Sequence, residues 1–325
     1  MDPVSVTAEP APAPERAHWP LVSVIMPTRG RPELVRESIA SVMGQTYPGE
    51  IECIVVHDQE PPDEELTRLS TPGRRIMVVT NTHTPGLAGS RNAGLGHAHG
   101  DFIATCDDDD VWHPDKLERQ IARMLEEPNL LLVGSGIRMR LPGGKILNWP
   151  GRADRISYEL LLRNRVKELH SSTMVMRRET FTKAGPYDEG LPFSHAEDYD
   201  MALRAARAGD VGMIREPLAD VRKNIPNMRD RFHGGGFRNV AMGLEYVLAK
   251  HPDIAASRRG HARVLGKIAY ARSQLGERRT AFRYASKALV RWPLSPHPYI
   301  ALAHIVTQAD PRHMLRAARL FRRGI

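Results

Sequence analysis

The stretch LVSVIMPTRGRPELVRESIASVMGQTYPGEIECIVVHD, residues 21–58, predicts a strand, a helix and a second strand in succession. Residues 21–27 and 51–58 are short apolar runs, and residues 31–45 form an amphipathic helical pattern. The same alternation continues along the 325-residue chain to about residue 209. Short apolar strands between helical segments indicate an α/β fold, here a mostly parallel sheet with helices on both faces.

The elements after residue 58 follow the same alternation. Strands are expected at 75–81, 101–107, 129–140 and 170–178, and helices at 62–70, 89–100, 113–128, 157–166 and 196–209. From about residue 240 onward the pattern is helical only. Residues 1–19 are acidic and rich in Pro and Ala, which predicts a disordered tail, and they lack the basic start and apolar stretch of a signal peptide. No apolar run approaches membrane-spanning length.

Charge divides the chain into two parts. Residues 226–325 carry 19 Lys and Arg against 5 Asp and Glu, whereas residues 1–225 carry 27 against 33. This asymmetry predicts a working domain over 20–225, a Gly-rich flexible loop over 226–240 and a basic helical region over 241–325. A basic appendage favours an anionic surface or an acidic partner. Nucleic acid is not expected, because the sequence holds no recognition motif and no aromatic stacking platform.

The C-terminal all-helical region has tetratricopeptide-like (TPR-like) spacing. Its small or apolar positions are Leu265, Ile268, Ala269, Gly276, Ala281, Ala285, Ala288 and Pro293. One and a half repeats cannot form a stable solenoid alone, so the region should pack on the preceding domain or bind a partner. An unspecialised helical pair is the alternative. Residues 312–325 could form an amphipathic helix that rests on anionic lipid, or that packs on the last repeat helix.

Four consecutive aspartates, residues 107–110, follow the predicted strand at 101–107. In open parallel sheets, ligands bind beyond the carboxyl ends of the strands. Asp107 and Asp109 flank one residue there, and a Mg²⁺ or Mn²⁺ ion held by one or two carboxylates is completed by substrate phosphates. Such an ion would also relieve the carboxylate repulsion. The alternative is that Asp110 caps the helix that opens near Pro114.

Three other kinds of site are excluded. An EF-hand loop would need Gly where Trp112 stands, and a P-loop would need Lys where Leu95 follows GSRNAG. Two cysteines, Cys53 and Cys106, lie in apolar strand-like runs and form neither a disulfide framework nor a zinc site. A reducing cytoplasm fits this cysteine usage.

A second acidic motif, HAEDYD at residues 195–200, opens the predicted helix at 196–209. Acids are common in a first helical turn because the helix dipole favours negative charge. The same dipole should keep Asp198 ionised, while Glu197 and Asp200 should raise its pKa. That balance would suit a general base.

Three blocks together resemble family-2 glycosyltransferases of the GT-A (Rossmann-like) fold. They are VSVIMPTRGRPELVRESIASVMGQTYPGEIECIVVHD, PGLAGSRNAGLGHAHGDFIATCDDDDVWHPDKL and HAEDYDMALRAARAG, in the family's order and on the expected elements. The resemblance covers roughly residues 20–225. It implies a nucleotide-sugar donor, usually a UDP-sugar, a divalent Mn²⁺ or Mg²⁺ ion, and inversion at the sugar carbon.

The resemblance also assigns residues to the donor. Those implied to line it are Pro27, Thr28, Arg29, Asp58, Gly86, Arg91, Asn92, Asp107, Asp108 and Arg222. Asp109 is the main metal candidate in the DxD region, with Asp107 beside it. Asp198 matches the catalytic base, with Glu197 next to it.

The chain departs from the family pattern in two places. His57 replaces one of two acids at the end of the second strand. Many members carry a His after the last strand, whereas this chain has Asn224, so His233 in the Gly-rich loop is expected to substitute as a metal ligand. Arg222 would pair with the diphosphate.

The function expected from these features is an inverting, metal-dependent hexosyltransferase in cell-surface polysaccharide or glycoconjugate synthesis. Its location would be cytoplasmic, peripheral at the inner face of the membrane, and its acceptor a glycan, a lipid-linked sugar or a protein. The alternative is a non-catalytic nucleotide- or glycan-binding scaffold that recruits a partner through its helices. A sugar-phosphate nucleotidyltransferase ranks lower, because PTRGRPEL lacks the Gly-rich turn and following Lys of that class.

Overall fold

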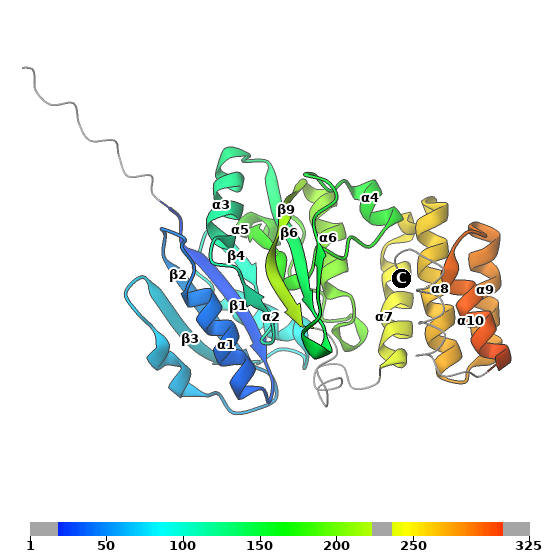
Figure 1. The fold of residues 1–325 in the computed structure, drawn as a ribbon, viewed down its shortest axis with the longest axis horizontal. Helices are drawn as coiled ribbons and strands as arrows, with labels where there is room; N and C mark the ends of the chain where they lie inside the picture. The colour runs from blue at the N-terminus through cyan, green and yellow to red at the C-terminus, as the bar shows by residue number, and fades with distance from the viewer. Residues whose placement is uncertain (1–18, 223–235, 308–325) are drawn as a thin grey trace, which may run out of the picture.

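The computed structural model describes residues 19–222 and 236–307, which form a sheet domain and a helical region (Figure 1). The sheet has nine strands in the order β3-β2-β1-β4-β8-β6-β9-β5, with β7 paired to β6. The strands are β1 (Val22–Thr28), β2 (Ile51–His57), β3 (Arg74–Thr80), β4 (Phe102–Thr105), β5 (Val111–Trp112), β6 (Leu130–Arg140), β7 (Ile146–Trp149), β8 (Val175–Arg177) and β9 (Asp210–Arg222).

The first four strands of the sheet run parallel, as the alternation predicted. β1 pairs with β2 and β4, and β2 pairs with β3, all in parallel register. The crossover helices are α1 (Pro32–Met43) and α2 (Leu87–Gly96). The short helix expected at 62–70 is a 3₁₀ helix, η1 (Glu64–Leu69), between β2 and β3.

The second half of the sheet is mixed rather than parallel. β8 runs antiparallel to β4 and β6, whereas β9 is parallel to β6 and antiparallel to β5. The strand expected at 170–178 shrinks to β8, because residues 171–173 form the 3₁₀ helix η3 (Ser171–Thr173), in which the Thr173 hydroxyl donates to the carbonyls of Glu168 and His170. β9 was not among the predicted strands, since register shifts and Pro217 interrupt its pattern.

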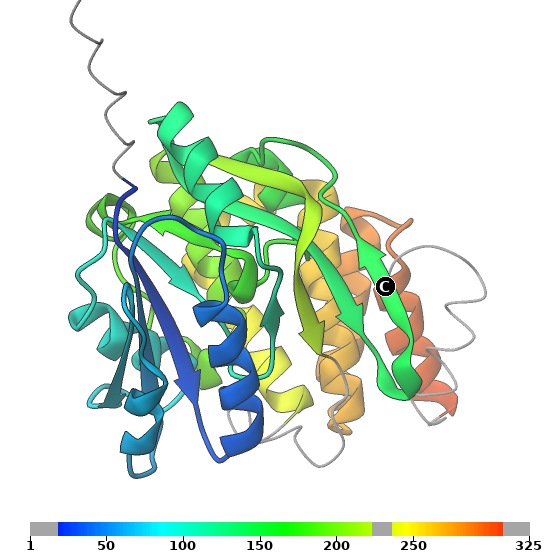
Figure 2. The same cartoon turned by 60° about the vertical axis from the view of Figure 1, so that its left-hand side comes forward.

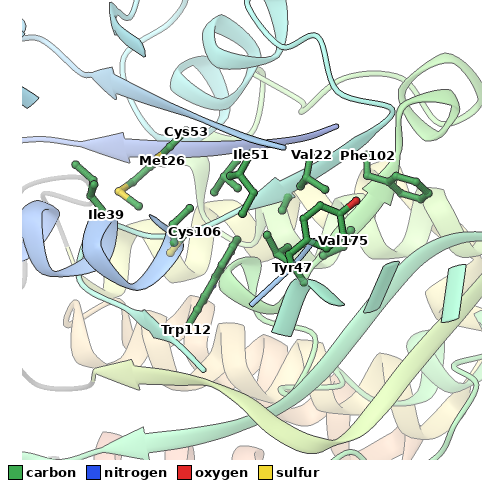
Figure 3. Packing of buried hydrophobic residues seen from close by; sticks show 14 of the residues in the cluster. Val22, Met26, Ile39, Tyr47, Ile51, Cys53, Phe102, Cys106, Trp112 and Val175 are labelled. Atoms are coloured by element: carbon green, nitrogen blue, oxygen red, sulfur yellow. The ribbon is translucent and has the colours of Figure 1, made fainter. Parts of the chain in front are cut away.

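Helices cover both faces of the sheet, which confirms that prediction. α1 and α3 (Lys116–Glu126) pack on one face, in the cluster drawn in Figure 3. α2, α5 (Arg178–Lys183) and α6 (Glu197–Ala208) lie on the other face. Successive side chains of a strand point to opposite faces, so Met26 packs on the face covered by α1 and α3, and Ile25 packs on the face covered by α2.

Two expectations about the start of the chain and its cysteines can be compared with the structure. The predicted tail extends one residue too far, because Trp19 packs edge-on against Tyr47 with ring centroids 5.3 Å apart. Residues 1–18 lie outside the described residues. Cys53 and Cys106 are free thiols in the core, and burial raises the pKa of Cys53 to about 12.

The helical region comprises α7 (Phe237–Lys250), α8 (Arg258–Gln274), α9 (Arg278–Arg291) and α10 (Pro296–Thr307). Figure 1 shows α7 between the sheet domain and the other three helices, and Figure 2 shows these yellow-to-orange helices behind the sheet, with α1 in front. α7 begins at Phe237, so the last four residues of the loop predicted for 226–240 are helical, and residues 226–235 lie outside the described residues. The amphipathic helix expected at 312–325 lies outside the described residues.

The helical region packs on the sheet domain through apolar residues. Val264 and Ile268 of α8 belong to the same buried cluster as Leu161 of α4 (Tyr158–Arg163) and Tyr199 of α6. Six of the eight positions expected from TPR-like spacing are buried, namely Leu265, Ile268, Ala269, Ala281, Ala285 and Ala288, whereas Gly276 and Pro293 are exposed. No helix within the described ranges has the length and apolar character needed to cross a bilayer.

Candidate active site

Asp58 lies at the carboxyl end of β2 and anchors the loop that begins α2. Its carboxylate accepts hydrogen bonds from the Asn81 side chain at 2.8 Å and from the Gly86 amide at 3.2 Å. Arg29 approaches it to 3.8 Å from a half-exposed position. The structure therefore brings together three of the residues expected at the donor, with Asn81 as a fourth.

The turn that faces Gly86 is strained. Phe193, Ser194 and Ala196 all adopt positive φ angles, of 58°, 50° and 70°. The Ser194 hydroxyl accepts from the amide of Ala88, and a Cβ on Gly86 would lie 2.9 Å from Ser194 Oγ. Strain of this kind persists only where the surroundings enforce it, and it clusters at functional sites. Here it sets where α6 begins.

The middle pair of the aspartate run faces Arg31. Asp108 accepts from the Thr28 hydroxyl and from Arg31, both at 2.8 Å, and Asp109 accepts from the same guanidinium at 3.0 Å. Burial raises the pKa of Asp108 to about 7; Arg31 opposes the shift and Asp109 adds to it. The predicted repulsion within the run is therefore real, and Arg31, two residues beyond the expected Arg29, is a partner that sequence reasoning missed.

Asp107 and Asp110 face the other way, toward residues 170–172. Ser171 donates to Asp107 at 2.8 Å and Ser172 donates to Asp110 at 2.5 Å. His170 Nδ1 lies 3.5 Å from Asp110. Asp107, Asp110 and His170 each offer a ligand atom within 4.8 Å of the others.

This arrangement changes two expectations about the aspartate run. Asp110 is not a helix cap, because α3 begins at Lys116 with Asp115 at the N-cap position. Asp109, the main metal candidate from the sequence, lies outside the group of three and pairs with Arg31. His233 lies outside the described residues, and His170 is the histidine that the structure places beside the run. His170 was visible only as the first residue of a predicted strand.

Arg91 connects the aspartate run to the second acidic motif. Its side chain is fully buried, donating to Asp107 at 2.8 Å and to Glu197 at 2.5 Å. Burial alone would lower its pKa, but Glu197 and Asp107 raise it well above the ordinary value. Two carboxylates 90 residues apart in sequence therefore share one permanent cation.

Asp198 is held by a partner that the sequence did not indicate. Arg165 Nη2 donates to its two oxygens at 2.7 and 2.9 Å, and the Tyr199 amide donates at 2.6 Å. Burial opposes ionisation, but Arg165, His170 and these hydrogen bonds outweigh it and lower the pKa of Asp198 to about 2.

The predicted influence of Asp200 on Asp198 is not found. Asp200 instead accepts from Arg204, Lys250 and His251, which ties α6 to α7 and to the residue that follows it. Asp198 is ionised because of Arg165 rather than because of a balance between the helix dipole and neighbouring acids.

The remaining residues predicted to bind the donor are Asn92, Arg222 and Pro27. Asn92 exchanges hydrogen bonds with the backbone of Tyr187 and donates to Glu189. The backbone amide of Arg222 donates to Asp110 at 3.1 Å, and its guanidinium pairs with Glu37. Pro27 is buried within β1, one residue before Thr28.

A comparison with protein families matches residues 23–183 to the description "Glycosyl transferase family 2". The UDP-Glc:alpha-D-GlcNAc-diphosphoundecaprenol beta-1,3-glucosyltransferase WfgD of Escherichia coli is 33% identical over 196 residues, which are 60% of this chain and 73% of that protein. The chain belongs to glycosyl transferase family 2. An uncharacterized glycosyltransferase from Methanocaldococcus jannaschii is 31% identical, over 66% of this chain and 73% of that protein.

Solved structures show that this family-2 glycosyltransferase has the GT-A fold. Residues 1–349 of S. aureus TarS in complex with UDP-GlcNAc superpose with a TM-score of 0.59 at 16% identity, over 93% of this chain and 92% of that one. Mannosyltransferase PcManGT from Pyrobaculum calidifontis, in complex with GDP-Man and Mn²⁺, gives 0.54 at 17% identity, over 94% and 85%. Coverage above 90% includes most of the helical region as well as the sheet domain.

Proposed function

We propose that this family-2 glycosyltransferase moves a sugar from a UDP-sugar to an acceptor hydroxyl with inversion at the sugar carbon. The observation that carries the proposal is the Arg91 bridge, because it couples the aspartate run to the helix that bears Asp198. A metal and donor site and a general base would thus be held in one rigid frame, as catalysis by positioning requires.

The donor would lie along the carboxyl ends of β1, β2 and β4. Asp58 is a fully buried acceptor that could receive the N–H of a uracil ring, with Arg29 beside it. Arg31 is a cation that pairs with the aspartate run and could contact a diphosphate. Arg222 joins the run through its backbone amide, and its guanidinium could contact a diphosphate by exchanging Glu37 for it. The WfgD relative acts on UDP-Glc, which supports uridine as the base.

The proposed step is a single displacement. The acceptor O–H gives its proton to Asp198 as its oxygen forms a bond to the sugar carbon, from the face opposite the diphosphate. The bond from that carbon to the diphosphate oxygen breaks, and its electron pair leaves with the nucleoside diphosphate. No covalent bond to the protein forms, so one inversion results.

Two carboxylates and one imidazole, from Asp107, Asp110 and His170, form a donor set that suits Mn²⁺ and accommodates Mg²⁺. A divalent ion held there would neutralise charge on the departing diphosphate. Arg91 and Ser171 already hydrogen-bond the Asp107 carboxylate and would orient it toward an ion. Asp109 would become a ligand only by exchanging Arg31 for the ion.

The acceptor is proposed from the relative that acts on a diphosphoundecaprenol-linked sugar. A sugar carried on a lipid or on another glycan would present its hydroxyl at a membrane surface, in polysaccharide or glycoconjugate synthesis. Peripheral contact with the cytoplasmic face of the membrane would be consistent with the basic charge of residues 226–325.

The variant Asp198→Asn tests the proposal, because it keeps the size of the side chain and removes the base. Transfer should fall by about 10³-fold or more, within the range for loss of a general base, while binding of UDP by calorimetry should stay within about twofold. Asp115→Asn, which changes a half-exposed carboxylate at the start of α3, is the matched control. Normal turnover by Asp198→Asn would refute the base assignment, and NMR of the product anomer would show inversion or retention.

A further inference from the structure

Five basic side chains lie where the helical region meets the sheet domain. Arg165 and Lys167 come from the segment between α4 and η3, Arg263 and Lys267 from α8, and His297 from the first turn of α10. These five residues are called the basic cluster below. All are partly accessible to solvent rather than sealed in the core.

The basic cluster begins at the proposed base and extends along α8. Arg165 pairs with Asp198, and Arg263 contacts the next residue, with Nη2 3.2 Å from Tyr199 Oη and the guanidinium 5.6 Å from the ring centre. Lys267 follows Arg263 by one helical turn on the same face of α8. His297 packs against Gly266, which lies between Arg263 and Lys267 on α8. A Cβ added at Gly266 would lie 2.8 Å from the Cβ of His297.

Among the described residues, the cluster has too few acidic partners. Within residues 19–222 and 236–307, no ion pair joins Lys167, Arg263 or Lys267 to a carboxylate, and the nearby Glu168 pairs with Arg152 at 3.3 Å. In the same part of the chain, Arg263 Nε and both ring nitrogens of His297 are buried without a hydrogen-bond partner. Buried donors without acceptors are rare in proteins and call for an explanation.

Burial and mutual repulsion within the cluster lower the pKa of two of its side chains, Lys267 and His297. Burial, reinforced by Arg263, Arg165 and Lys167, lowers the pKa of Lys267 to about 7. Burial, reinforced by Lys267, Arg263 and Lys167, lowers the pKa of His297 to about 3. The site would therefore gain charge as well as hydrogen bonds if an anion entered it.

A purely structural role explains the cluster poorly, because elsewhere at the same interface basic side chains are paired with an acid. At Asp200, one buried carboxylate takes Arg204, Lys250 and His251, so cations are matched by an acid. The basic cluster has the opposite imbalance.

We propose that the basic cluster binds a phosphate or diphosphate group belonging to the acceptor, so that the attached sugar hydroxyl reaches Asp198. This inference rests on the proposed function, in which Asp198 is the base. The acceptor must attack from the face opposite the leaving diphosphate, so its anchor belongs on the Asp198 side and not at the aspartate run. Several cations around one group suit phosphate oxygens, which accept from guanidinium and ammonium donors together.

The test uses the full chain with UDP and Mn²⁺ present, so that the donor site is occupied, and inorganic pyrophosphate as the probe in calorimetry. The wild type should bind pyrophosphate with an affinity that falls as salt rises. The double variant Arg263→Gln/Lys267→Gln should lose at least tenfold in affinity. Lys287→Gln, an exposed lysine on α9, should bind as the wild type does.

Two further arms separate the sources of the phosphate. An alkyl diphosphate represents a lipid-linked sugar, and a glycerol phosphate oligomer represents a phosphodiester polymer. The probe whose affinity depends on the double variant identifies the acceptor class. Equal binding of all probes by the wild type and the double variant would overturn the inference.

The single variant Lys267→Gln serves as a control for misfolding. It removes one repelling charge and should melt at or above the wild-type melting temperature. It should also lose several-fold in pyrophosphate affinity, and full affinity in this variant would count against the cluster. Failure of the proposed function is separately visible. If the wild type turns over no UDP-sugar but still shows cluster-dependent pyrophosphate binding, the anion site stands and the base assignment fails.

Discussion

Replacing Arg165 with Met should change both the stability of the protein and the pH dependence of its activity. Arg165 holds Asp198 through two hydrogen bonds, and the Asp198 side chain is 8% exposed. Lowering a carboxyl pKa from 3.8 to about 2 stabilises the folded protein by roughly 2–3 kcal/mol at neutral pH, since each pH unit corresponds to about 1.4 kcal/mol. The variant should lose at least that amount.

The sign of the pH dependence follows from the direction of the pKa shift. A depressed carboxyl pKa stabilises the folded protein above pH 4 and ceases to do so as the pH falls toward 2. Without Arg165, burial still penalises the charged form, so the pKa of Asp198 should rise above 3.8. The acidic limb of the kcat/KM profile should then move upward by about 2 pH units or more, toward the pH range in which activity can be measured.

Urea unfolding at pH 7 and rate profiles from pH 4 to pH 8 would measure these effects. Arg163→Met, an exposed arginine at the end of α4, is the matched control and should change neither quantity. In an Asp198→Asn background, Arg165→Met should cost much less than it does in the wild type, because the charge that Arg165 pairs is gone. An unchanged stability together with an unchanged acidic limb would refute the reasoning.

Two other substitutions test the donor side of the site. Gly86→Ala should destabilise the protein by about 2 kcal/mol or more in urea unfolding, because Gly86 has φ 114° and a Cβ would meet Ser194 Oγ at 2.9 Å. Gly96→Ala is the control and should be neutral or slightly stabilising, since a Cβ there meets nothing within 4 Å. His170→Ala should weaken Mn²⁺ binding by about tenfold or more by calorimetry, whereas the exposed His97→Ala should not; equal Mn²⁺ affinity in both would remove His170 from the metal site.

The first half of the sheet could be predicted from the sequence because its signals are local. An apolar run of seven residues such as β1 or β2 is buried on both faces, and the helices between them carry their own amphipathic pattern. The mixed second half was harder. η3 and β8 depend on hydroxyl hydrogen bonds and on pairing with β4 and β6, which no short window of sequence contains.

The candidate site divides in the same way. The sequence by itself determined which acids are present and where they stand, since a charged run behind a strand and acids at a helix start are both local patterns. Only the tertiary structure decided what each acid faces. Arg91 and Glu197 are 106 positions apart, and Arg165 and Asp198 are 33 apart. The protonation state and aim of each carboxylate depend on such partners, because the electrostatic energy of a buried charge is set by distance in space and not by distance along the chain.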